Sequence, residues 1–304
     1  MNDTGTQEML FYELSWSEIT APAKATLAYD TSGEYEYKRA DVNHLLKVFL
    51  NDRVADPMAY FGESHEKILR SVGTGMCWMA INDWNDLPPK GAPACDGFQF
   101  TNPQEYNEDE FVFVTHSLGS RIVTDVFQQA AESVLEMIDK TSYTAQERNN
   151  QLALLDAQRN KEIRVYMLAN QLPLLELGGS PPPVVGQMDA YCKRGGGHYD
   201  ERFFSELSII AFSDPNDPLS YALPAKYADD YMDSRLCPEI VNVSVNVVDA
   251  IDLFGLGEFV NPMAAHSSYE EDDRVIGLIV GGIGFETTDP AVAAECRWLE
   301  TVDE

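Results

Sequence analysis

A serine placed at a sharp turn is the residue of this sequence best suited to nucleophilic chemistry. The apolar run Phe111–Val114 continues directly into Thr115-His116-Ser117-Leu118-Gly119, and a predicted helix follows at once. A strand–turn–helix setting of this kind is typical of a nucleophile elbow, G-x-S-x-G, in which the serine hydroxyl stands clear of the sheet. Thr115 departs from the first glycine of that pattern. The alternative is a chance match within a helix-capping turn.

A nucleophilic serine also needs an oxyanion donor and a general base. The turn would aim the backbone N–H of Leu118 at a developing oxyanion. Of the five histidines, only His198 and His266 follow Ser117 in the chain order Ser, acid, His that suits this turn. His198 precedes a further predicted strand, whereas His266 follows the last clear one. We therefore predict His266 as the base, against the alternative of a surface histidine.

The acid that orients the base is expected just beyond the predicted strand Leu207–Phe212. Asp214 and Asp217 both lie there, in Ser213-Asp214-Pro215-Asn216-Asp217-Pro218. Because each of them precedes a proline, either could instead simply initiate a turn. On the residues alone both stay candidates for the acid.

Strands and helices alternate along the chain, which predicts an α/β fold with a mainly parallel sheet. We expect one domain over residues 1–304. The segment 176–205 is rich in glycine and proline and is either a lid or an ordinary surface loop. The expected core strands cover residues 10–16, 111–114, 163–169, 207–212 and 241–248.

The charge balance excludes several classes of partner. The chain carries 21 Lys and Arg against 50 Asp and Glu, a net charge of 21 − 50 = −29. Binding a nucleic acid needs clustered basic residues, and docking on anionic lipid needs the same. The hydrophobic content of 44% nevertheless supports a folded core. The acidic surface therefore serves solubility or tolerance of salt, or else it attracts a cationic partner.

Targeting, cofactor and metal signals are absent from the sequence. Met1–Met9 lacks the pattern of a signal peptide, and the longest apolar stretch, Val275–Phe285, is too short for stable membrane insertion. Val280–Gly284 lacks the spacing of a dinucleotide-binding loop, so we expect no cofactor. The five cysteines form no CxxC pair. They are expected to be free thiols in the cytoplasm, with no metal bound.

Three segments together resemble the α/β-hydrolase superfamily, particularly its lipase-like and esterase-like branches. The first is Phe111–Arg121 around Ser117. The second, Asp217–Pro224, is similar to the acid-bearing stretch of class 3-type lipases and favours Asp217 over Asp214. The third, His266–Tyr269, is similar to the H-x-x-Y around the family's base. The resemblance implies a three-layer αβα sandwich whose Ser-His-Asp triad hydrolyses a small-molecule or lipid-like carboxylic ester.

Two features depart from that family. No His-Gly or glycine-rich loop precedes the nucleophile, so the usual second oxyanion donor is missing. The predicted strands also account for only part of the family's sheet, as if N-terminal strands were lacking, and an incomplete sheet leaves an edge that a second copy of the chain could cover. The alternatives are therefore a non-catalytic binding or scaffold protein of the same fold and an acyltransferase.

Overall fold

The structure, a computed structural model, describes residues 9–31, 39–81, 103–138, 144–252, 258–283, 288–295 and 297–299. Where the sequence led us to expect one domain, the chain forms two compact units. The first contains Met1–Glu108 and Lys140–Ala157, and the second contains Asp109–Asp139 and Gln158–Glu304. All the residues predicted to carry chemistry belong to the second unit.

The first unit is helical in the part of the chain that is described. Its buried centre includes Tyr60, Ile68 and Val72. The strand expected over residues 10–16 is wrong, because this segment runs without a strand partner into the first helix. The helices are α1 (Ser17–Thr31), α2 (Asp41–Phe49), the π-helical turn η1 (Leu50–Val54), α3 (Ala55–Tyr60), α4 (His65–Ile81), α5 (Pro103–Glu108) and most of α7 (Ala145–Arg159).

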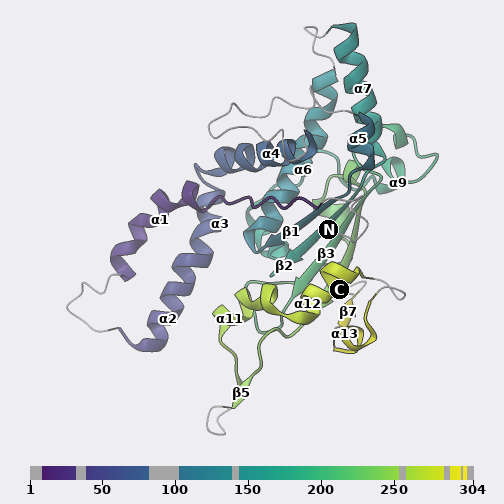
Figure 1. The fold of residues 1–304 in the computed structure, drawn as a ribbon. Coiled ribbons are helices and arrows are strands. Elements are labelled where there is room, and N and C mark those ends of the chain that lie inside the picture. The colour runs from purple at the N-terminus through teal and green to yellow at the C-terminus, as the bar shows by residue number, and fades with distance from the viewer. Residues whose placement is uncertain are drawn as a thin grey trace. The chain divides into compact units, whose positions relative to one another are not determined.

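The second unit is built on a five-stranded sheet of order β1-β2-β3-β4-β7 (Figure 1). The first four strands are parallel and the last is antiparallel to β4, which confirms the predicted α/β class. The strands are β1 (Phe111–His116), β2 (Glu162–Leu168), β3 (Glu206–Ser213), β4 (Pro238–Ser244) and β7 (Arg297–Leu299). A separate pair joins β5 (Ile251–Asp252) to β6 (Glu258–Phe259).

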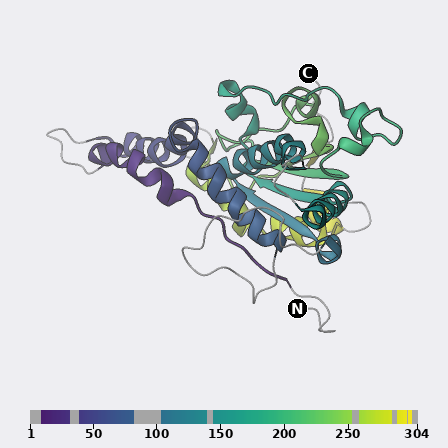
Figure 2. The same cartoon turned by 90° about the horizontal axis from the view of Figure 1, so that it is seen from above.

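Helices cover both faces of this sheet, which makes three layers (Figure 2). On one face lies α6 (Leu118–Ile138), whose Phe127 ring packs edge-on against Phe113 and Phe204. On the other lies α12 (Asp273–Gly281), whose Val275 and Leu278 join a buried cluster with side chains of β2, β3 and β4. The remaining short elements are α8 (Leu172–Leu175), η3 (Glu176–Gly178), α9 (Met188–Tyr191), η4 (Tyr199–Glu201), α10 (Tyr227–Tyr231), η5 (Ser234–Leu236), α11 (Pro262–Ser267), η6 (Ser268–Glu271) and α13 (Pro290–Glu295).

Strand β1 is half-buried on one face, and on the other face two of its valines are exposed. The sequence led us to expect burial on both faces, but Val112 is 45% exposed and Val114 is 53% exposed. Among the described strands β1 pairs only with β2, so it ends the sheet and is flanked less than an inner strand. Coverage of this edge by a second copy of the chain stays a prediction.

The segment from Val184 to Ser205 is fastened at the amino-terminal edge of the sheet. Ser234 donates its backbone N–H to the carbonyl of Val184 (2.8 Å), and Ser205 donates to Lys161 (2.9 Å). A disulfide joins Cys192 to Cys237, the residue before β4. The expectation of free thiols is wrong for Cys77, which is also disulfide-bonded, and for these two cysteines. Their pairing could not be inferred from spacing, because 45 residues separate them.

In the described part of the chain, no helix is both long enough and apolar enough to span a bilayer.

The disulfide predicts a loss of stability on reduction. Closing a loop of 45 residues restricts the unfolded chain, so replacing both Cys192 and Cys237 by Ala should lower the free energy of unfolding by about 3–4 kcal/mol. Urea unfolding of the variant and the wild type, each without reductant, measures the difference. Rapid alkylation of Cys192 in the denatured, unreduced wild type would contradict the assignment.

A second prediction concerns Asp272, which caps α12. Its carboxylate accepts hydrogen bonds from the backbone N–H groups of Arg274 (2.9 Å) and Val275 (3.3 Å) and pairs with the Arg274 guanidinium. Burial alone would raise the pKa of Asp272, but these hydrogen bonds hold it below its ordinary value. The stabilisation is therefore present above the unfolded pKa and is lost as pH falls through the lower folded pKa.

Asp272→Asn should accordingly lower the free energy of unfolding by about 1 kcal/mol at neutral pH. The difference from wild type should begin to shrink below about pH 4, where the carboxyl becomes protonated in the unfolded chain, and should be lost as the pH falls through the lower folded pKa. Thermal denaturation as a function of pH measures it, with Asp273→Asn on the same helix as the matched control. A difference that is independent of pH would contradict a role for the charge.

Candidate active site

The turn between β1 and α6 holds Ser117 in a rare backbone conformation. Its φ angle is +56°, in the left-handed region that residues other than glycine seldom adopt. The backbone N–H of Ser117 donates to the carbonyl of Leu168 at the end of β2 (2.8 Å), which fixes the turn to the neighbouring strand. Conformations of this kind cluster at functional sites, since the surrounding structure must compensate for their cost.

The structure accommodates Thr115 in the place where the elbow pattern has glycine. The Thr115 side chain is buried, and its hydroxyl lies 3.1 Å from Ser120 Oγ and 3.3 Å from the carbonyl oxygen of Tyr166. The extra polar atom thus has partners. The departure from the pattern therefore leaves no hydroxyl unsatisfied beneath the turn.

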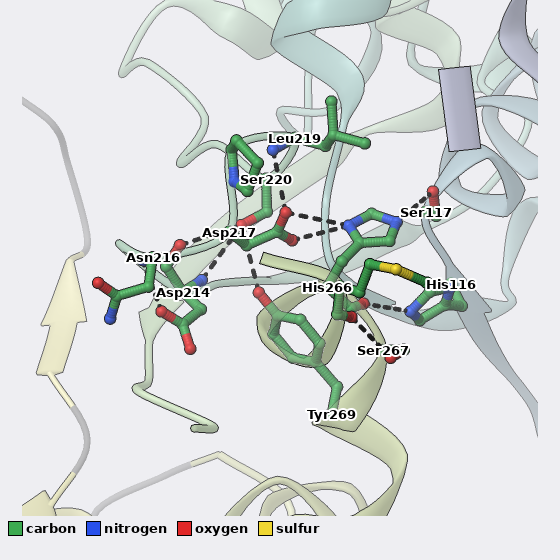
Figure 3. Close-up of polar contacts among 12 residues, drawn as sticks. His116, Ser117, Asp214, Asn216, Asp217, Leu219, Ser220, His266, Ser267 and Tyr269 are labelled. Atoms are coloured by element: carbon green, nitrogen blue, oxygen red, sulfur yellow. Dashed lines mark hydrogen bonds and ion pairs between the residues drawn. The ribbon is translucent and has the colours of Figure 1, made fainter. Parts of the chain in front are cut away.

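Ser117, His266 and Asp217 lie in one hydrogen-bonded line (Figure 3). The Nε2 atom of His266 lies 3.0 Å from Ser117 Oγ, and its Nδ1 atom lies 2.9 Å from one Asp217 carboxylate oxygen and 3.0 Å from the other. Because the carboxylate accepts, Nδ1 carries the proton and Nε2 accepts from the serine hydroxyl. The side chains of Asp217 and His266 are fully buried. The structure thus brings together the three residues predicted from separate segments.

The neighbouring Asp214 has a different place. One of its carboxylate oxygens accepts the N–H of Asn216 and the other accepts the N–H of Val247, both at 2.7 Å. These bonds close a turn after β3 and join it to the chain beyond β4. Of the two candidate acids, Asp217 is therefore the one at the imidazole, and Asp214 shapes the loop that carries it.

Further contacts hold the segment that carries His266, and one of them, made by His116, was not predicted from the sequence. The His116 Nε2 atom donates to the backbone carbonyl of His266 (2.8 Å), and the two rings meet edge-on with centroids 5.2 Å apart. Tyr269 Oη lies 3.2 Å from Ser220 Oγ, in the loop after β3 that carries Asp217 (hereafter the acid loop), and burial raises the pKa of Tyr269. Tyr269 was visible within the H-x-x-Y pattern, whereas no local signal linked His116 to a residue 150 positions away.

His198 and the segment that contains it lie elsewhere. The His198 ring stacks on Tyr191, and its Nδ1 lies 3.0 Å from Glu201, in the segment fastened at the amino-terminal edge of the sheet. Figure 1 shows α9 and α11, the helix that carries His266, at opposite ends of the sheet. Of the two alternatives for 176–205, a lid or an ordinary surface loop, the position of α9 at the end of the sheet opposite α11 favours a surface loop for this part of the segment.

A buried charge cluster anchors the first turn of α6, the helix that directly follows Ser117. Arg121 pairs with Asp125 (2.9 Å) and with Glu176, and Tyr227 donates to the same Glu176 carboxylate (3.1 Å). Burial raises the pKa of Glu176 although Arg121 opposes that shift. The cluster ties α6 to the segment that follows α8. It thereby fixes the helix that begins with Leu118.

Leu118 is the first residue of α6, so its backbone N–H has no acceptor within the helix. This N–H, at the positive end of the helix dipole, is placed to stabilise negative charge that develops near Ser117. Among the residues that the structure describes, no group of three or more His, Cys, Asp or Glu side chains could hold a metal ion.

Comparison with known proteins gives no significant match to a family model, a curated protein or a solved structure.

The hydrogen bond from His266 to Asp217 should be visible by NMR. A buried N–H held between imidazole and carboxylate is expected to give a proton resonance far downfield of the backbone amides. Asp217→Asn should abolish this resonance, because it replaces the carboxylate that accepts the Nδ1–H of His266 by a neutral amide. Asp214→Asn is the matched control and should retain it. Loss of the signal in the control alone would assign the acid to Asp214 instead.

Proposed function

We propose that this protein is a serine hydrolase that cleaves a carboxylic ester through Ser117, His266 and Asp217. The observation that carries the proposal is the continuous hydrogen-bonded line from Ser117 Oγ through both ring nitrogens of His266 to the buried Asp217 carboxylate. The positive φ of Ser117 and the position of Leu118 at the start of α6 support it. The same three residues carry the resemblance to lipase-like and esterase-like α/β hydrolases.

In the first step Ser117 Oγ bonds to the ester carbonyl carbon while His266 Nε2 takes the hydroxyl proton. The imidazolium that forms is stabilised by the Asp217 carboxylate, which also keeps the ring in the correct tautomer. The backbone N–H of Leu118 donates to the oxyanion. The carbon–oxygen bond to the alcohol then breaks, and His266 returns the proton to the leaving alcohol.

In the second step water attacks the acyl group held on Ser117. His266 takes a proton from that water, and the bond between the acyl carbon and Ser117 Oγ breaks. The acid is released, and Ser117 regains its proton. Atoms and charges balance without a cofactor or metal. An alcohol acceptor in place of water would make the same site an acyltransferase, and product analysis with added alcohol separates the two.

The substrate class follows from the resemblance and from the charge of the chain. Ester rather than amide is preferred by analogy with the family alone. The net charge of −29 makes an anionic membrane surface an unfavourable place to work, so a dissolved or uncharged ester suits the protein better. The non-catalytic alternative, a binding or scaffold protein, predicts no Ser117-dependent turnover.

The compartment is a separate proposal. The cytoplasm was predicted from free thiols, and the disulfide between Cys192 and Cys237 removes that basis. Because disulfides form and persist mainly in oxidising surroundings, we propose that the protein works in such surroundings instead.

The test of the proposed function is turnover of p-nitrophenyl acetate. Ser117→Ala should lower kcat by about 10⁴-fold or more, because nucleophile and base act as one unit. Ser133→Ala, which removes an exposed hydroxyl on the same helix α6, is the matched control and should match the wild type. Equal turnover in Ser117→Ala, or no turnover by the wild type across an ester series, would contradict the proposal.

A further inference from the structure

The side-chain amide of Gln171 is buried without a partner. Gln171 is 1% exposed, and within the described part of the chain neither its Nε2 nor its Oε1 has a hydrogen bond. Each of the other described side chains with a buried polar atom that makes no hydrogen bond has only one such atom. A buried donor or acceptor left unpaired is costly. Such a group calls for a physical explanation. One explanation is that a ligand forms hydrogen bonds with the amide when it binds.

The backbone places Gln171 between the nucleophile and the acid. Leu168 accepts from the N–H of Ser117, and Asn170 donates its N–H to Phe212 at the end of β3. The Asn170 side chain donates to the carbonyl of Tyr221, in the loop that starts from Asp217. Gln171 follows directly, and its own carbonyl accepts from the N–H groups of the last two residues of α8. Its position at the carboxyl-terminal edge of the sheet is therefore fixed from both sides.

We propose that the Gln171 carboxamide binds an amide group in the acyl part of the substrate. The inference rests on the proposed function and adds a substrate class to it. The Nε2 donor and the Oε1 acceptor of glutamine stand side by side on one edge. The complementary partner presents an acceptor and a donor side by side as well, as a primary carboxamide does. A plain alkyl chain would leave both atoms unpaired.

The acyl side is favoured by the direction of the reaction. The leaving alcohol departs toward His266, which returns its proton, while the acyl group stays on Ser117 Oγ. The turn that carries Ser117 is hydrogen-bonded to the strand end that leads into Gln171. Gln171 therefore belongs to a segment joined to the turn that would hold the acyl group, which is why the acyl half of the substrate is assigned to it.

A glutamine that is paired only when substrate is bound should not contribute to the stability of the free protein. Gln128 offers the contrast, because its Oε1 accepts the backbone N–H of Asp233 (3.2 Å) in the absence of any ligand. Gln171→Leu keeps the approximate volume and removes the unpaired polar atoms, so its Tm should equal or exceed that of the wild type. Gln128→Leu removes a hydrogen bond and should lower the Tm.

The experiment compares two p-nitrophenyl esters of the same shape, the 4-amino-4-oxobutanoate, which ends in a primary amide, and the 4-methylpentanoate. The ratio of their kcat/KM values is measured for the wild type, Gln171→Leu and Gln128→Leu, with hydrolysis in the presence of Ser117→Ala subtracted as background. Gln171→Leu should reduce the preference for the amide ester at least about tenfold, since a site built to hydrogen-bond discriminates strongly against an apolar analogue. Gln128→Leu should leave the ratio unchanged.

Three results would overturn the inference. They are an unchanged ratio in Gln171→Leu, an equal loss on both esters, and a lowered Tm that marks Gln171 as structural. In each case the wild type still hydrolyses the esters, so the proposed function stands. Failure of the wild type on every ester would instead defeat the proposed function and the inference together.

Discussion

The hydrogen bond between His266 and Asp217 is the interaction on which the rest of the site depends. A carboxylate with no exposed surface is stable only when charged or polar donors surround it, because burial of an isolated charge is expensive. Asp217 receives the Nδ1–H of His266 and the N–H of Leu219. The loop after β3 that carries Asp217 and the helix α11 are therefore bound to each other, and Nε2 of the His266 ring faces Ser117.

The parallel sheet makes this contact possible, because the carboxyl-terminal ends of its parallel strands lie at one edge. Ser117 follows β1, the acid loop follows β3, and His266 comes after β4, so all three approach the same edge. Polar pairs then hold the connections in place. Asp214 joins the acid loop to the chain beyond β4, and Ser220 joins it to Tyr269. At the opposite edge the segment from Val184 to Ser205 is closed by backbone hydrogen bonds and a disulfide.

Much of this arrangement was predictable because local pattern carries it. Apolar runs mark the first three parallel strands, whereas valines that alternate with polar residues mark the fourth, which was predicted over 241–248 and covers Pro238–Ser244. Ser117 is marked by a short motif at the end of β1, and His266 by its place after the last of these strands. Asp217 could not be separated from Asp214 by the residues alone, since both begin turns before proline, and only the resemblance favoured it. Hydrogen-bond geometry separates them, because both oxygens of Asp214 are occupied by backbone N–H groups.

Other features depend on distant parts of the chain and left no local signal. The aromatic segment at residues 10–16 has the composition of a strand but gains no ladder partner, and Val112 and Val114 are apolar yet exposed because β1 ends the sheet. Two further contacts join segments that are far apart in the sequence. They are the disulfide between Cys192 and Cys237 and the hydrogen bond from His116 to the His266 carbonyl. So is the unpaired amide of Gln171, since whether a buried group has a partner is decided by the folded chain.

The central claim is that Ser117 is a nucleophile activated by His266, and covalent labelling tests it most directly. Wild-type protein and His266→Ala are treated with a fluorophosphonate probe, digested, and mapped by mass spectrometry. We expect an adduct on Ser117 in the wild type, and we expect the same adduct to form far more slowly in His266→Ala. No adduct on Ser117, or labelling of Ser117 at the same rate in both proteins, would contradict it.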